Sequence, residues 1–193
     1  MNRATVTTEL RRQFFPILRA AGFHRKGEVL FRELPGPVAQ LVEVQHRPSS
    51  GVFRVNLGAH LPALDGTAAV KLRESGCAWR SSIVSGFRTK DDSDFAYGGT
   101  EADAAESVAF LVSEWDRQSA EFFRPLSDFP AGFHECARES LAEDLHPAHR
   151  LTWAKVARLV GDDELARRIA EQALPDVPER ATTLRAQLEA LLG

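Results

Sequence analysis

The stretch from Gly22 to Leu61 constrains the fold more than any other part of this chain. It contains three runs rich in valine and other apolar residues, at 29–34, 38–47 and 52–61. Two short segments of Pro, Gly and Ser, at 35–37 and 48–51, separate these runs. Because turns this short connect strands only when the strands run antiparallel, the stretch predicts a three-stranded meander.

The third strand shows which side of the meander is buried. Its apolar residues alternate with polar or small ones, so the two sets lie on opposite faces. The apolar set is Phe53, Val55, Leu57, Ala59 and Leu61, and the other set is Arg54, Asn56, Gly58 and His60. With a fourth strand expected at 77–85, we predict an α+β fold: an antiparallel sheet of about four strands covered on one face by helices.

Two helices are expected to cover the apolar face. The first spans 7–21, with Thr7 and Thr8 as caps, a kink near Arg12 caused by Pro16, and Gly22 as the left-handed residue that ends it. The second begins at Thr100 and ends before Pro125. Asp103 stands three residues after Thr100, which is the spacing of a capping box.

The chain beyond Pro130 has only helical patterns. We expect helices at 131–143, 147–160, 163–174 and 178–192, the middle two forming a hairpin across Gly161. The domain prediction is an α+β core at 1–130 and a helical extension at 131–193.

The opening stretch also resembles a known family, domain of unknown function 4304. The residues that carry the resemblance are Gly22, Phe23, Lys26, Gly27, Phe31, Arg32, Gln45, Phe53, Asn56, Leu57 and Gly58. His24 and Pro48 depart from the family pattern, and the later parts of the chain fit it more loosely. The resemblance implies the same helix-and-strand layout. It implies no activity, since the family has no agreed one.

One polar surface is a candidate binding site. Arg54, Asn56 and His60 lie opposite the core residues of their strand, and register decides which polar residues of neighbouring strands join them. The candidates are Arg32, Gln45, Arg47 and Arg80. Guanidinium groups beside an amide and an imidazole suit a phosphate, a carboxylate or an acidic partner surface. The preferred alternative is a solvated outer face, which antiparallel sheets ordinarily have.

Two groups of residues are of the types that bind metal ions. His134, Cys136, His146 and His149 are ligand types that suit zinc, but their spacing matches no zinc finger and Pro147 interrupts the helix between them. Asp91, Asp92 and Asp94 lack the glycine and the distal glutamate of a calcium loop. We therefore expect no metal and no cofactor.

Motifs for catalysis are also missing from the sequence. Ser81 and Ser82 stand outside any nucleophile elbow, and no glycine-rich phosphate loop occurs. A net charge of −3 argues against a nucleic-acid partner. The chain lacks both a signal-peptide pattern and an apolar run long enough to span a membrane, so a cytoplasmic protein without a membrane partner is expected.

These observations favour a non-enzymatic binding protein with an unknown protein partner, for example an immunity-type or accessory factor. The alternative is a site for a small molecule or an anionic ligand, with or without catalysis, on the arginine-rich sheet face. Whether the chain is an enzyme is left open by the sequence, with the balance against it.

Overall fold

The computed structural model describes residues 3–26, 29–66, 71, 73–85 and 93–193. Contacts divide the chain into two compact units. One comprises Met1–Pro62 with Thr67–Arg124, and the other comprises Ala63–Gly66 with Pro125–Gly193. Each unit is described by itself, as the sheet unit and the helical unit. Of the calcium candidates, Asp91 and Asp92 lie outside the described residues, as does Gly27 of the family pattern.

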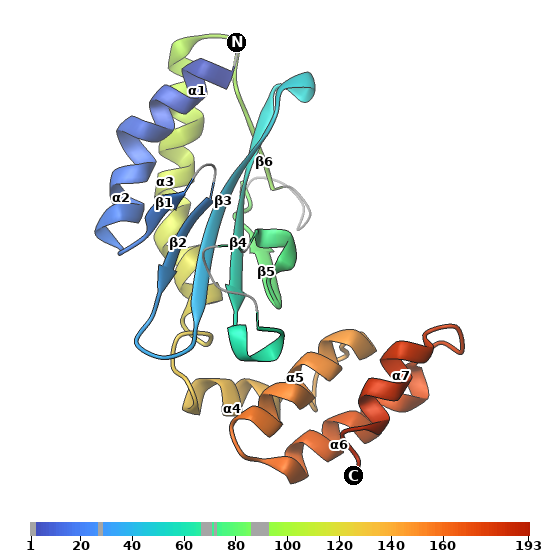
Figure 1. Cartoon of the computed structure of the whole chain (residues 1–193). Coiled ribbons are helices and arrows are strands. Elements are labelled where there is room, and N and C mark those ends of the chain that lie inside the picture. Colours follow the sequence, from blue (N-terminus) through green and yellow to red (C-terminus); the bar gives the residue numbers. More distant parts are fainter. Residues whose placement is uncertain (1–2, 27–28, 67–70, 72, 86–92) are drawn as a thin grey trace. The chain divides into compact units, whose positions relative to one another are not determined.

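The sheet unit is built on a six-stranded antiparallel sheet in the order β1-β2-β3-β4-β5, with β6 also paired to β4 (Figure 1). The strands are β1 His24–Lys26, β2 Val29–Glu33, β3 Ala39–Arg47, β4 Val52–His60, β5 Trp79–Ser82 and β6 Asp94–Ala96. This confirms the predicted meander and fold class. The two added strands have three residues each, which is too short for alternation to predict them.

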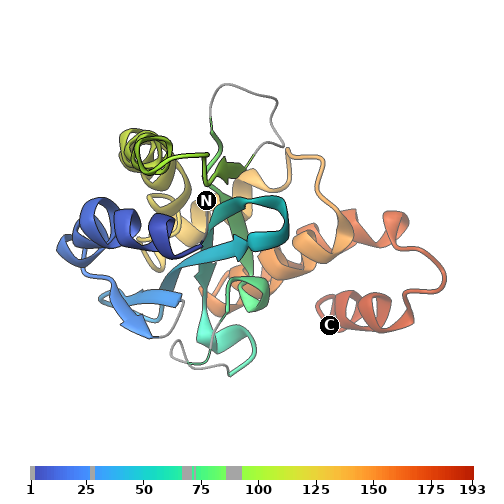
Figure 2. The same ribbon diagram turned by 90° about the horizontal axis from the view of Figure 1, so that it is seen from above.

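Helices cover one face of this sheet, as predicted. A continuous helical segment consists of α1 Arg3–Glu9, a π-helical turn at Leu10–Phe14 and α2 Phe15–Ala20. It lies beside α3, Glu101–Phe123, on the same side of the sheet (Figure 2). Trp115 of α3 joins the layers, because its ring lies 5.1 Å from that of Phe14 and 6.5 Å from that of Phe23.

The first helix begins earlier than predicted, and its threonines do not cap it. The hydroxyl groups of Thr7 and Thr8 donate instead to the carbonyl groups of Arg3 and Ala4 one turn before them. The π-helical turn contains Arg12, near which the sequence predicts a kink caused by Pro16. Proline lacks an N–H group, so the local helical pattern has to change there.

The end of this helix follows the prediction closely. Gly22 has a φ of 84°, the left-handed conformation that glycine adopts without strain. The N–H of Gly22 donates to the carbonyl of Arg19, and the N–H of Phe23 donates to that of Leu18. This pair of bonds is a Schellman motif, and it turns Phe23 into the core, where it is 1% exposed.

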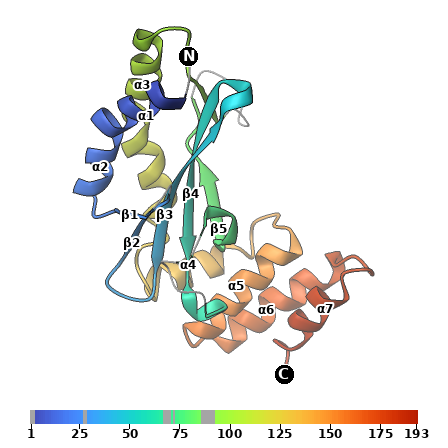
Figure 3. The ribbon, with the colours of Figure 1, turned by 45° about the horizontal axis from the view of Figure 1, so that its top comes forward.

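The helical unit contains α4 Ala131–Glu139, α5 Pro147–Leu159, α6 Asp163–Ala173 and α7 Thr182–Glu189. Helices α5 and α6 form the expected hairpin (Figure 3). Gly161 turns the chain between them with a φ of 90°. Buried alanines let the two helices approach: Ala154, Ala157, Ala166, Ala170 and Ala173. Among the described residues, no helix combines the length and apolar character needed to cross a bilayer.

Candidate functional site

The register of β3 and β4 divides their residues between two faces. Phe53, Val55 and Leu57 belong to the core cluster that includes the helices, and at most 1% of each is exposed. On the opposite face, polar residues stand side by side across four strands. We call this group the polar strip, and it consists of Glu43, Gln45, Arg47, Arg54, Asn56, Ser82 and Asp94.

Two arginines of the polar strip share one carboxylate. Arg54 Nε donates to Asp94 Oδ1 at 2.9 Å, and Nη2 of the same guanidinium lies 2.8 Å from that oxygen. Arg47 Nη1 lies 3.7 Å from Asp94 Oδ2. The side chains of Arg47, Arg54 and Asp94 are 41%, 25% and 34% exposed, so solvent reaches all three. Asp94 thus contacts both guanidinium groups at once.

Asn56 and Ser82 form the adjoining part of the strip. Ser82 Oγ donates to Asn56 Oδ1 at 2.9 Å across β4 and β5. This hydroxyl is held by an amide oxygen, which is not a base, so the contact does not activate it as a nucleophile. Asn56 is 8% exposed and faces Glu43 across β3 and β4.

A second charged group, which the sequence did not predict, borders the strip at Glu43. Glu43 Oε1 accepts from Arg73 Nη1 at 3.1 Å, and Glu43 Oε2 accepts from the backbone N–H of Glu74 at the same distance. Arg80 lies 3.9 Å from the carboxylate of Glu74. Burial raises the pKa of Glu74, with Arg80 opposing and Glu43 adding to this effect. Residue 73 and residue 43 are far apart in sequence, so only the fold could reveal this contact.

The far end of the same face is covered, which corrects the expectation of a solvated face. Cys77 follows the turn η5 (Glu74–Gly76) and packs with Val29, Ala39 and Leu41 in a small apolar cluster. His60 at this end is 2% exposed and therefore belongs to the interior. The candidate His60 is thus placed on the predicted face but outside the accessible polar strip.

Arg32 lies on the other face of the sheet. It pairs in register with Gln40, which pairs with Ala59 of the core side. Its Nε donates to Gln40 Oε1 at 2.8 Å and its Nη1 donates to the carbonyl of Ala21 at 2.7 Å. The structure therefore brings together Gln45, Arg47, Arg54 and Asn56 as expected, places Arg80 beside them, and separates Arg32 from the group.

Three of the four candidate zinc ligands of the helical unit have other polar partners. His134 Nε2 lies 2.8 Å from Asp162 Oδ2, and His146 Nδ1 accepts from the N–H of Ala148 as the cap of α5. Cys136 Sγ lies 3.9 Å from the carbonyl oxygen of Pro125. Within the ranges that the structure describes, no three His, Cys, Asp or Glu side chains gather as a metal site.

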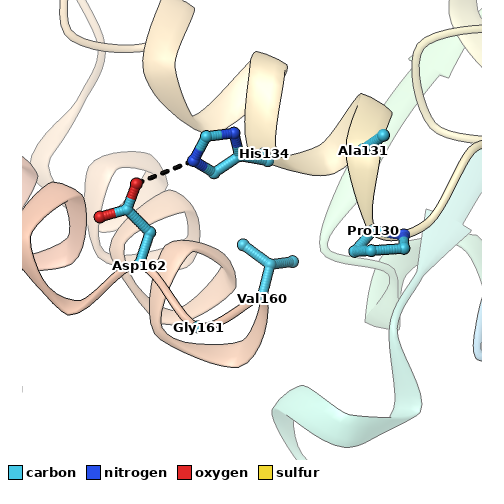
Figure 4. Close-up of a pocket in the computed structure, with 6 residues that line it drawn as sticks. All are labelled: Pro130, Ala131, His134, Val160, Gly161 and Asp162. Carbon is cyan, nitrogen blue, oxygen red and sulfur yellow. Dashed lines mark hydrogen bonds and ion pairs between the residues drawn. The ribbon is translucent and has the colours of Figure 1, made fainter.

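His134 and Asp162 also line a pocket of about 410 Å³, within the size range of small-molecule sites (Figure 4). The rest of its wall is Pro130, Ala131, Val160 and Gly161. Asp162 is the N-cap of α6, since its Oδ1 accepts from the N–H of Leu165 at 2.9 Å. The carboxylate of Asp162 thus links His134 of α4 to the first turn of α6. This structural role explains why the two side chains lie together.

Comparisons of the chain with protein-family models, with curated proteins and with solved structures found no match. The resemblance to domain of unknown function 4304 therefore stays an expectation that rests on the residues of the opening stretch.

Proposed function

We propose that this chain is a non-enzymatic binding protein whose polar strip contacts an acidic group of a protein partner. The single observation that supports this proposal most is the sharing of Asp94 by Arg47 and Arg54. One carboxylate contacts both guanidinium groups, and solvent reaches both of them. A partner carboxylate entering the strip would add a second negative group to this arrangement.

The geometry of Arg54 suits such a contact. Its guanidinium carries more N–H donors than Asp94 Oδ1 uses, and a quarter of the side chain stays exposed. An arginine already held in place loses less side-chain entropy when it binds a second acceptor. Gln45, which is exposed and directly opposite Arg54 in register, adds an amide that donates and accepts.

The chemistry of the strip favours binding over catalysis. Its hydroxyl group donates to an amide oxygen, and its carboxylates Glu43 and Asp94 are each held by arginines. Fixed charges of both signs with solvent access are typical of the polar rim of protein interfaces. An immunity-type or accessory role is one form that such binding can take.

Site-specific photo-cross-linking in cells of the source organism tests this proposal. A photoreactive residue at Gln45 reports on the strip, and one at Glu121, 78% exposed on α3, is the matched control. We expect a discrete cross-linked protein from position 45, absent from position 121, that disappears when Arg54→Glu is added.

Two other results would overturn the protein-partner proposal. One is the same cross-linked product with and without Arg54→Glu, which would place the contact elsewhere. The other is no cross-linked protein from position 45 together with an Arg54-dependent rise in melting temperature on adding phosphate or citrate. That second result would identify the strip as a site for a small anionic ligand.

A further inference from the structure

Arg32 is held in a rigid setting on the helix-covered face of the sheet. Its guanidinium carbon lies 4.5 Å from the ring centre of Phe23 and 5.7 Å from that of Phe123. Cation–π contacts of this length fix the plane of the guanidinium group. The hydrogen bonds from Nε to Gln40 and from Nη1 to Ala21 fix its rotation within that plane.

The partners of Arg32 are all uncharged. Gln40 is an amide, Ala21 contributes a carbonyl group, and Phe23 and Phe123 contribute rings. Among the described residues no carboxylate forms an ion pair with it, whereas Arg47, Arg54 and Arg80 each have one. Arg32 is half-buried, and this burial lowers its pKa. A positive charge withdrawn from water without a negative partner is costly.

A structural role explains only part of this arrangement. The carbonyl of Ala21 belongs to the C-terminal end of α2, where a cation interacts favourably with the helix dipole. Nη1 therefore already has the Ala21 carbonyl as its acceptor, and Nε already has the side chain of Gln40. The Nη2 group donates to none of the described residues. A guanidinium fixed on two sides with its third nitrogen unused is prepared to bind an oxyanion through Nη2.

We propose that Arg32 is the anchor of a site for a carboxylate or phosphate group of a small molecule, at the edge of the sheet formed by β1 and β2. Gln40 and Ala21 orient the guanidinium, which packs against the adjacent rings of Phe23 and Phe123. This site is separate from the polar strip, because Arg32 and the strip lie on opposite faces of the sheet. It therefore does not depend on the function proposed above.

The test measures the melting temperature with inorganic phosphate or succinate, at ionic strength held constant with potassium chloride. We expect at least one of the two anions to raise the melting temperature of the natural protein. Arg32→Met, which keeps an apolar side chain against the rings of Phe23 and Phe123, should remove the rise. The matched control is Arg117→Met, which removes an exposed arginine of α3 outside both proposed sites and should keep the rise. A response to phosphate alone or to succinate alone identifies the class of oxyanion.

A second measurement covers the case in which Arg32→Met does not fold. Titration of the natural protein with each anion, followed by NMR of the arginine side-chain Nε–Hε groups, should shift the Arg32 signal more than those of Arg54 and Arg80. Equal shifts in melting temperature for the natural protein and Arg32→Met would overturn the proposal. So would the absence of any Arg32 signal change with both anions.

Discussion

The sulfur atom of Cys77 occupies the place where a side chain on Gly58 would begin. A Cβ atom built on Gly58 lies 2.6 Å from Cys77 Sγ and 3.2 Å from Cys77 Cβ. The segment that carries Cys77 therefore packs directly on the backbone of β4. This contact closes one end of the face that also carries the polar strip.

Gly58→Ala is expected to destabilise the sheet unit by about 1–3 kcal/mol, the usual cost of overpacking a filled site. The reason is steric, because the φ of Gly58 is not one that requires glycine. The free energy of unfolding from urea denaturation measures the effect. Gly76→Ala is the control, since a Cβ there meets nothing within 4 Å, and it should change stability little. Adding Cys77→Ala should recover part of the Gly58→Ala loss, and two additive losses would contradict the contact.

Cys77 is expected to resist alkylation in the folded protein. Burial raises the pKa of its thiol to about 12, so the reactive thiolate is scarce at pH 8. Mass spectrometry after timed iodoacetamide treatment should show faster labelling of Cys136, which is only partly buried. Both residues should react equally fast in guanidinium chloride. Fast labelling of Cys77 under native conditions would show that the segment covering β4 opens readily.

The parts of the fold that were predictable are those with local causes. Alternation identified the core side of β4, Gly22 ended the first helix, and Thr100 with Asp103 started α3. Each of these features depends on residues within a few positions of one another. The short strands β1 and β6 offered too few residues for any periodicity to show.

The candidate site was only partly predictable, because it depends on register and on distant segments. Nothing local indicates that Arg32 pairs with Gln40 and so faces the helices. Likewise, the sequence places Arg73 and Glu74 in a weakly patterned region, yet both contact Glu43. The covering of His60 follows from the same kind of long-range packing.

The capping box of α3 should make the stability of the sheet unit depend on acid pH. The N–H groups of Gly99 and Thr100 donate to Asp103 Oδ2, and these bonds lower the pKa of the carboxyl group. A lowered folded-state pKa means that the stabilisation is complete above the ordinary value of 3.8 and is lost as the pH falls through the folded-state value. The gap in unfolding free energy between the natural protein and Asp103→Asn should therefore shrink from pH 7 to pH 3. Thr100→Ala, which removes the other half of the box, should cost about 1 kcal/mol at pH 7.

The contact between His134 and Asp162 should be visible in the titration of the aspartate. The hydrogen bond with His134 is the largest cause that lowers the pKa of Asp162, followed by the N–H of Leu165. Carboxyl carbon NMR should show a higher pKa for Asp162 in His134→Ala than in the natural protein. His149→Ala, which removes an exposed histidine whose ring lies near that of His146, is the control. An unchanged pKa in His134→Ala would contradict the contact.

Of the arginines of the helical unit, Arg150 should be the one whose replacement lowers the free energy of unfolding most. It is 6% exposed, and its Nη1 donates to the carbonyl of Gln172 at 3.2 Å while its Nη2 donates to that of Glu143 at 3.0 Å. Asp176 Oδ2 lies 3.3 Å from Nη1 and supplies the negative charge. One guanidinium thus satisfies backbone groups from two segments that lie far apart along the chain.

Arg150→Met fills similar space but removes the guanidinium donors from both carbonyl groups and leaves Asp176 without its cation, so we expect a loss of about 3 kcal/mol in the free energy of unfolding. Arg150→Lys should recover only part of it, because a lysine ammonium cannot reproduce the fork of the guanidinium. Arg158→Met is the matched control: Arg158 also donates to two backbone carbonyls, but its side chain is 42% exposed, and water can replace it there. We expect a loss below about 1 kcal/mol for that control. Equal losses for the two arginines would mean that burial of Arg150 contributes nothing beyond its hydrogen bonds.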